Sequence, residues 1–172
     1  MSALLSISSC VNDLRFHEVV WFLPVATALH FPEEAPRFAA WAQKYTSPHF
    51  TQAHWKRIHS IGFAYVLVFS AMVSFYPYRP LVFLFFALCF LESGLNAVFH
   101  LGATLYFRAY SPGVLTAIVL YPPLLWVATR TALSEELLSV ASLGMALAVT
   151  TILHSLDVAK NVFFCFPKMR AS

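Results

Sequence analysis

The chain has 172 residues, of which 59% are hydrophobic and only 11% are charged, and its mean hydropathy is +0.69. An average soluble domain carries about 25% charged residues, so a soluble fold of this length could not bury so much apolar surface. The composition also excludes a disordered chain, a coiled coil and collagen. The net charge of +3 comes from eleven scattered Lys and Arg residues, too few for a nucleic-acid-binding surface. We therefore expect an integral membrane protein whose surroundings are the lipid bilayer.

Five apolar stretches approach the roughly 20 residues that a membrane-spanning helix needs. They cover residues 16–31, 58–76, 81–107, 114–132 and 137–156. Pro24 interrupts the first, and Pro122 with Pro123 predicts a kink or break near the middle of the fourth. Ser134, followed by two glutamates, has the pattern of a helix start for the fifth. The sequence predicts an all-α, polytopic membrane helical bundle, with residues 1–172 forming a single domain.

The basic residues predict the orientation of this bundle. With five spans, eight Lys and Arg residues fall on one side of the bilayer and three on the other, and cytoplasmic loops carry the excess. The N-terminus is then non-cytoplasmic and the C-terminus cytoplasmic. Residues 35–45 place Phe38, Trp41 and Tyr45 at helical spacing, opposite basic and amide side chains. This pattern predicts one further helix that lies in the membrane interface on the cytoplasmic side.

Three of the stretches carry polar or ionisable residues, which are expensive inside a membrane and therefore face a protein interior or a wet cavity. They are His30, Glu33 and Glu34 at the end of the first, Glu92, Asn96 and His100 in the third, and His154 and Asp157 in the fifth. The predicted topology brings most of them to one depth near the cytoplasmic side. That coincidence predicts a shared polar site.

Each of these residues also has an ordinary structural interpretation. Glu33 and Glu34 could form a solvated helix end, and Asn96 could hydrogen-bond between helices. The histidines could be neutral interior side chains, and Asp157 could pair with Lys160 at the interface. The combined pattern favours a functional site over these separate interpretations.

Three ordered motifs lead to a family resemblance. His30 to Glu34 reads H-x-x-E-E, Asn96 and His100 read N-x-x-x-H, and Tyr110 to Thr116 reads Y-x-P-G-x-x-T. In this order and at these separations, they resemble the HXXEE-domain family of small polytopic membrane proteins. The resemblance implies a membrane topology, and it implies that the His, Glu and Asn residues of the first two motifs belong to one site. It implies no particular activity.

A second, partial resemblance concerns Glu33, Glu34 and Arg37. They read E-E-x-x-x-R, which is similar to the first motif of CAAX-type intramembrane proteases. Those proteases use a glutamate to activate water. Their second motif has Phe where this chain has Asn96, and their third has Asn or Asp four residues after a His, whereas Asp157 follows His154 by three.

Acid–base chemistry suits this set of side chains. Two neighbouring carboxylates in a low-dielectric pocket cannot easily both ionise, so their pKa values separate and supply an acid and a base. Imidazoles can shuttle protons, and an amide can donate to an oxyanion. We therefore predict the catalytic residues His30, Glu33, Glu34, Asn96, His100 and His154. The predicted substrate-binding residues are Glu92, Tyr110, Thr116 and Asp157.

A divalent metal is the competing use of the same groups. His30, His100, His154 and the Glu33 carboxylate would make a mixed nitrogen and oxygen site for zinc or iron. Pro32 opposes this arrangement, because a proline biases the residue before it away from helical geometry. His30 and Glu33 then need not share a helix face.

Two functions follow from the sequence. The first is a membrane-embedded hydrolase, cyclase or isomerase that acts on a lipid-like, polyketide-like or terpenoid-like substrate by Glu and His acid–base chemistry. The alternative is a non-catalytic membrane protein that binds or transports a metal ion or a lipid-like ligand. The chain shows no convincing internal repeat, which many transporters have.

Overall fold

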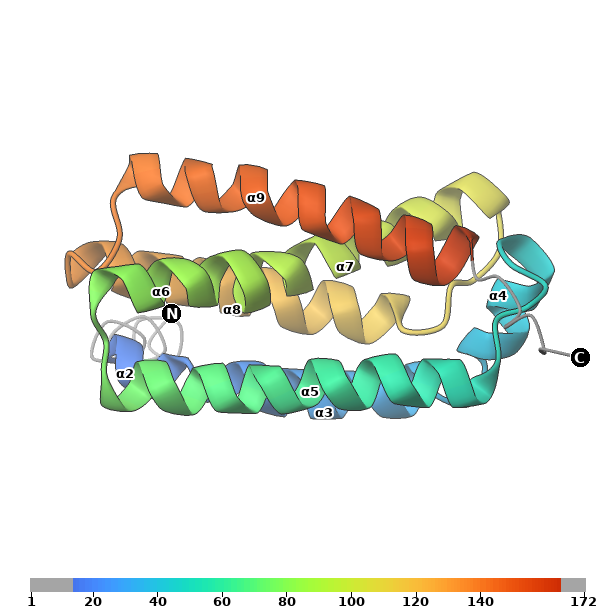
Figure 1. Ribbon diagram of the computed structural model, residues 1–172, viewed down its shortest axis with the longest axis horizontal. Coiled ribbons are helices and arrows are strands. Elements are labelled where there is room, and N and C mark those ends of the chain that lie inside the picture. The colour runs from blue at the N-terminus through green and yellow to red at the C-terminus, as the bar shows by residue number, and fades with distance from the viewer. Residues whose placement is uncertain (1–13, 165–172) are drawn as a thin grey trace, which may run out of the picture.

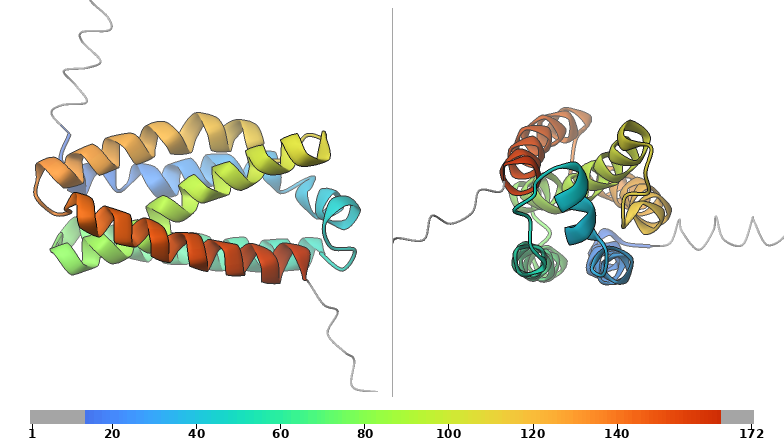
Figure 2. Two further views of the ribbon diagram at one scale, coloured as in Figure 1. Left: turned by 90° about the horizontal axis from the view of Figure 1, so that it is seen from above. Right: turned by 90° about the vertical axis from the view of Figure 1, so that its right-hand side faces the viewer.

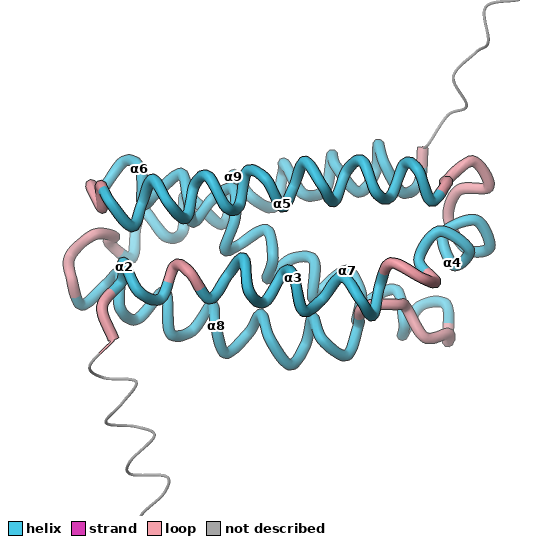
Figure 3. The backbone as a smooth tube through the Cα atoms, turned by 90° about the horizontal axis from the view of Figure 1, so that it is seen from below, coloured by secondary structure: helices cyan, strands magenta, loops and turns pink. Residues whose placement is uncertain are grey.

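The computed structural model describes residues 14–164, and every regular element in that part of the chain is helical (Figure 1). In chain order the elements are α2 (Phe16–Val19), α3 (Phe22–Glu34), α4 (Phe38–Tyr45), α5 (Gln52–Phe75), α6 (Arg79–Phe85), the π-helical turn η1 (Phe86–Phe90), α7 (Leu91–Phe107), α8 (Val114–Ser134), α9 (Val140–Val158) and the π-helical turn η2 (Ala159–Phe163). The long helices lie roughly side by side, with loops at the two ends of the bundle (Figure 3). The expected all-α bundle is confirmed.

Within residues 14–164, four segments are long and apolar enough to cross a membrane, which supports a multi-pass membrane protein. They are Gln52–Phe75, Arg79–Phe107, Val114–Ser134 and Val140–Phe163. The first predicted span differs, because a turn separates α2 from the 13 residues of α3 (Figure 3). At 1.5 Å per residue, α3 is about 20 Å long, short of the ~30 Å apolar core of a bilayer. The predicted count of five spans is therefore approximate.

The prolines do not end the helices that contain them. Pro24 lies in the first turn of α3, where its missing N–H would have no helical partner. Pro122 and Pro123 lie inside α8, which continues unbroken to Ser134. Pro32 lies in the last turn of α3, and that helix also continues past it. The local bias against helix before a proline is small, and the tertiary contacts of this turn described below outweigh it.

The start of the last long helix is also later than predicted. Ser134 ends α8 rather than starting α9, and Glu135 belongs to the connecting loop. Its carboxylate oxygen instead accepts a hydrogen bond of 2.8 Å from the backbone N–H of Phe16, at the start of α2. The N-cap of α9 is Ser139, whose hydroxyl accepts from the N–H of Ser142. A serine satisfies an otherwise unpaired N–H at a helix start.

The helix predicted in the membrane interface closes one end of the bundle. It begins at Phe38 rather than at residue 35, and it lies across the bundle end in the right-hand view of Figure 2. Phe38, Trp41 and Ala42 are buried, and they belong to one apolar cluster with Phe50 and Trp55. The apolar face of α4 therefore packs against the protein, where it excludes water from the helix ends beneath it.

The segment from α6 through η1 to α7 crosses the bundle diagonally (Figure 2, left). The π-helical turn η1 alters the regular backbone hydrogen bonding at Ala87, whose carbonyl accepts a 2.7 Å bond from the Thr150 hydroxyl of α9. Beyond this turn, α7 packs mainly against α8. This course brings the C-terminal half of α7 to the end of the bundle that α4 covers.

Candidate metal centre

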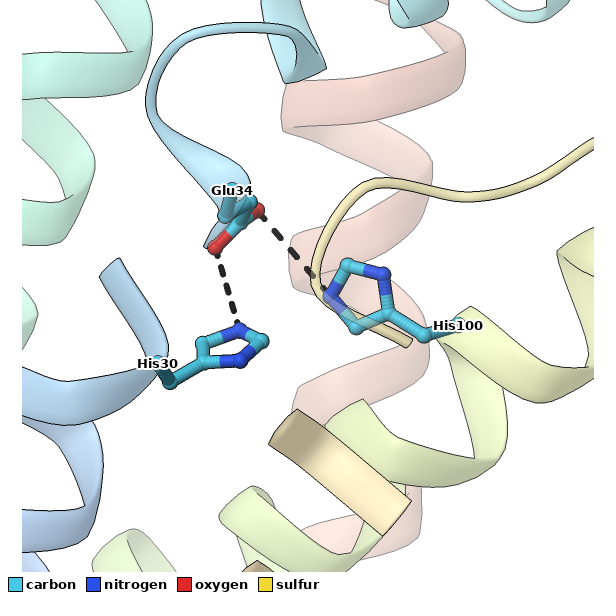
Figure 4. A group of neighbouring side chains, drawn as sticks. All are labelled: His30, Glu34 and His100. Atoms are coloured by element: carbon cyan, nitrogen blue, oxygen red, sulfur yellow. Dashed lines mark ion pairs between the residues drawn. The ribbon is translucent and has the colours of Figure 1, made fainter. Parts of the chain in front are cut away.

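His30, Glu34 and His100 meet in the protein interior beneath α4 (Figure 4). His30 and Glu34 are four residues apart and share one face of α3, and His100 comes from α7. The Glu34 Oε2 atom lies 3.2 Å from Nε2 of His30, and Oε1 lies 4.0 Å from Nε2 of His100. The exposed fractions of the three residues are 1%, 2% and 0%. We call these three residues the buried triad.

Neither Nε2 atom of the two triad histidines makes a hydrogen bond to any residue that the structure describes, although both are buried. Their Nδ1 atoms are engaged, 2.8 Å from the Thr116 hydroxyl for His30 and 3.0 Å from the Ser111 hydroxyl for His100. Buried polar atoms almost always have a partner. One ligand atom from each of the three residues lies within 4.8 Å of the other two, so the triad could hold a metal ion.

His59 of α5 is a fourth group beside the same carboxylate. Its Nε2 atom lies 3.0 Å from Oε2 of Glu34, and its Nδ1 atom lies 3.0 Å from the carbonyl oxygen of Trp55. Its side chain stacks on the Trp55 ring and is 21% exposed, more than any of the triad side chains. His59 is therefore less buried than the triad beside it.

Glu34 is ionised despite its burial. Burial by itself raises the pKa of this carboxyl, but the neighbouring imidazoles, His59 foremost, outweigh that effect and lower the pKa below its ordinary value. A buried carboxylate persists only where cationic or hydrogen-bonding groups face it. The triad therefore presents negative charge to the space between its side chains.

Glu33 points elsewhere and has its own set of partners at the start of α8. Its Oε1 atom accepts from the N–H of Leu115 at 3.1 Å and from the Tyr110 hydroxyl. Its Oε2 atom accepts from the N–H of Thr116 at 2.8 Å and from the Thr116 hydroxyl at 2.5 Å. Glu33 thus occupies the N-terminus of α8, where backbone N–H groups and the helix dipole favour an anion.

The pKa values of this cluster follow from those bonds. Partial burial tends to raise the pKa of Glu33, but the hydrogen bonds from Thr116, Tyr110 and the backbone lower it to about 2. Burial, together with the Glu33 carboxylate, raises the pKa of Tyr110 to about 12. Glu33 is thereby a fixed anion whose oxygens are already occupied by donors.

Gly113 brings the backbone unusually close to the triad. It is the N-cap of α8 and has φ = 100°, which is costly for any residue with a side chain. A Cβ atom at this position would lie 2.6 Å from Cε1 of His30 and 3.0 Å from Cε1 of His100. The motif glycine is therefore required both by its dihedral angle and by the two imidazole rings.

Aromatic rings complete the surroundings of the triad. Tyr121 of α8 lies against the His30 ring at a centroid distance of 5.5 Å, and Phe38 of α4 lies 5.9 Å from the His100 ring. The two histidine rings themselves meet edge to face at 5.3 Å. The triad is thus enclosed largely by apolar surface, where electrostatic interactions are stronger than in water.

The other predicted site residues lie apart from the triad. His154 of α9 pairs with Glu92 of α7 at 3.4 Å, and Asp157 accepts a 2.6 Å bond from Asn161. Asn96 is half-buried and makes no hydrogen bond to His30, Glu34 or His100. The expected single site therefore divides, with His30, Glu34 and His100 in the triad and Glu92, His154 and Asp157 toward α9. Tyr110 and Thr116, predicted to bind substrate, contact Glu33.

Three residues of this region are not among the predicted site residues: His59, Ser111 and Gly113. Two signals could have found them. His59 enters from the same side of the membrane as the polar ends of the other stretches, and Ser111 and Gly113 lie inside the Y-x-P-G-x-x-T motif.

Comparison with known proteins identifies one family. A family model described as "Protein of unknown function with HXXEE motif" matches residues 21–128, which is more than half of the chain. The matched part contains the triad, His59, Glu33 and Thr116, whereas His154 and Asp157 lie outside it. No curated protein and no solved structure matches the chain.

Proposed function

The chain belongs to the HXXEE family, and we propose that it is a membrane-embedded, metal-dependent hydrolase of a lipophilic substrate. The metal site is the buried triad of His30, Glu34 and His100. The observation that carries this proposal is the pair of buried Nε2 atoms, one on each histidine, that have no hydrogen-bond partner beside an ionised carboxylate.

A count of protons supports a bound cation. His59 must donate from Nδ1 to the Trp55 carbonyl, so its Nε2 atom can also donate to Oε2 of Glu34 only when the ring carries a second proton. The Nε2 atom of His30 faces the same oxygen from 3.2 Å. A single proton shared with Oε2 of Glu34 can satisfy the Nε2 atom of His59 or that of His30, but not both. A cation held by the triad would remove the repulsion that remains between the imidazole lone pair and the carboxylate, and His59 would be the neighbouring proton carrier.

The donor set indicates the kind of metal. Two imidazole nitrogens and one carboxylate oxygen suit zinc or iron, and such three-ligand sites leave a position for water or substrate. A divalent ion bound there would lower the pKa of a bound water molecule and polarise a substrate carbonyl.

The remaining residues would perform the proton transfers of a hydrolysis. The oxygen of water bonds to the acyl carbon of an ester, and the bond from that carbon to the alcohol oxygen breaks. His59 Nε2 takes the proton that the water loses and returns it to the leaving alcohol. The hydrophobic rings around the triad favour a substrate drawn from the bilayer and exclude bulk water.

The alternative is a protein that holds a metal ion without catalysis. Almost complete burial of all three triad residues favours this second candidate, because a catalytic centre has to admit a substrate. The exposed side of His59 is the feature that favours catalysis.

Metal analysis of protein purified in detergent without chelators tests the proposal. After incubation with Zn²⁺ or Fe²⁺ and removal of excess metal, we expect about one bound ion per chain by plasma mass spectrometry. His100→Ala should lose this ion, whereas His17→Ala, the same change at an exposed histidine, should keep it. A wild-type protein that retains no metal, or equal retention in both variants, would overturn the metal site.

A second measurement separates the two candidates. Loaded wild-type protein in liposomes containing long-chain acyl esters should release the fatty acid, and Glu34→Gln should not. Metal retention without any release, over a panel of acyl-chain and headgroup classes, would favour the non-catalytic candidate.

A further inference from the structure

We propose that Glu33 and Thr116 are positioning residues that fix the tautomer of His30, so that its Nε2 lone pair is directed into the triad. This inference rests on the proposed metal site and assigns a role to the first glutamate of the H-x-x-E-E motif. The relay runs from the Glu33 carboxylate through the Thr116 hydroxyl to His30 Nδ1.

The direction of the relay follows from the single hydrogen of the hydroxyl. Thr116 Oγ1 lies 2.5 Å from Oε2 of Glu33 and 3.3 Å from the carbonyl oxygen of Gly113. Both of these oxygens only accept, and a hydroxyl that donated to His30 instead would set its own lone pairs against the Glu33 oxygen at 2.5 Å. The hydroxyl hydrogen is therefore donated to one of the two oxygens. The 2.8 Å contact with His30 must then be donated by the imidazole, from Nδ1–H to Oγ1. A neutral His30 with its hydrogen on Nδ1 carries its lone pair on Nε2.

Glu33 is held in this orientation by donors other than Thr116. The backbone N–H groups of Leu115 and Thr116 and the hydroxyl of Tyr110 all donate to it. These contacts keep the carboxylate at the start of α8 whether or not a metal is bound. Glu33 therefore orients the hydroxyl, and the hydroxyl orients the imidazole.

The spacing of the motif has a geometric explanation on this basis. Successive residues of an α-helix point about 100° apart, because 3.6 residues complete a turn. Glu34, four residues after His30, shares its face and enters the triad, while Glu33 is turned toward α8. The two glutamates thus serve the same histidine from different directions, one beside Nε2 and the other through Nδ1.

The second triad histidine lacks an equivalent relay. Among residues 14–164, the hydroxyl of Ser111, beside His100 Nδ1, makes no further hydrogen bond to an acceptor. It can donate to that nitrogen or accept from it, so the tautomer of His100 is not fixed in the same way. The relay is a particular property of His30.

The test compares Thr116→Val with Thr116→Ser. Hydrogen-bond partners of metal-bound histidines contribute about 10- to 100-fold to metal affinity. We expect Thr116→Val to weaken Zn²⁺ binding by that factor, measured by competition with a chromophoric chelator, and Thr116→Ser to restore nearly wild-type affinity. The visible spectrum of the Co²⁺ form should change in Thr116→Val and return in Thr116→Ser. Thr151→Val, which removes a hydroxyl bonded within α9, is the matched control and should bind Zn²⁺ as wild type does.

Glu33→Gln provides a second variant that retains the hydroxyl and removes the anionic acceptor. It should also bind Zn²⁺ more weakly, while its helix content by circular dichroism stays that of the wild type. Wild-type affinity in both Thr116→Val and Glu33→Gln, together with metal loss in His100→Ala, would overturn the relay and leave the proposed metal site intact. Failure of the wild-type protein to bind any of the metals would overturn both.

Discussion

Replacing Gly113 by alanine should displace the triad histidines. A residue with a side chain in a strained backbone region costs about 1–3 kcal/mol, and the φ of Gly113 is 100°. The new Cβ would lie 2.6 Å from the His30 ring, whereas ordinary contacts begin at 3.4 Å, so the ring must retreat by about 0.8 Å. Metal–ligand distances tolerate only about ±0.2 Å. We expect Zn²⁺ affinity to fall at least about 10-fold and the free energy of unfolding by at least about 1 kcal/mol.

Gly102→Ala is the matched control for this substitution. Gly102 lies inside α7, and a Cβ there would meet nothing within 4 Å. Alanine in a helix interior is favoured over glycine by about 0.5–1 kcal/mol, so this variant should be neutral or slightly more stable. Thermal unfolding in detergent and chelator competition measure the two effects. If Gly113→Ala matched Gly102→Ala in both, the close approach of the backbone to the imidazoles would have no energetic importance.

Three further outcomes follow from particular contacts. Thr150→Val should lower the free energy of unfolding by about 1 kcal/mol, because polar contacts between membrane helices average ~0.6 and reach ~1.7 kcal/mol and the Ala87 carbonyl loses a donor that it shares with the Ala146 carbonyl. Denaturant titration in mixed micelles measures this change, and an unchanged stability would show that the hydroxyl serves Ala146 alone. Single cysteines can be placed at the exposed positions Ala40 and Ser134 in a background without native cysteines. They should react with an impermeant maleimide from opposite sides of sealed vesicles, with Ala40 on the cytoplasmic side. Labelling of both from the same side would refute the predicted topology. The folded-state pKa of Glu33 is about 2, below its ordinary value of 4.5. The stability advantage of the wild type over Glu33→Gln should therefore be complete above pH 4.5 and disappear as the pH falls toward 2. Melting curves recorded across this pH range measure the advantage, and a constant value would contradict an ionised Glu33 at the start of α8.

The sequence alone determined the class of protein and most of its helices. Composition required a membrane bundle, because 59% hydrophobic residues cannot be buried in a soluble chain of this length. The boundaries near Phe75, Phe107 and Val114 were also predicted, since prolines, glycine and polar residues interrupt the apolar runs there. The H-x-x-E-E and N-x-x-x-H motifs located α3 and α7, the two helices that carry the triad. These are local signals, which depend on neighbours along the chain.

The tertiary structure decided which polar residues meet. The sequence predicted that Glu33 and Glu34 act as one carboxylate pair. In the structure, α8 supplies hydrogen-bond donors to Glu33, and three histidines surround Glu34. Depth in the membrane suggested that His154 belongs to the same site, yet it pairs with Glu92. Depth fixes a position along the bundle axis only. The rotation of each helix, the diagonal course of α7 and the placement of α4 over the bundle end depend on packing between distant segments, and these select His30, Glu34 and His100 as the triad, with His59 beside them.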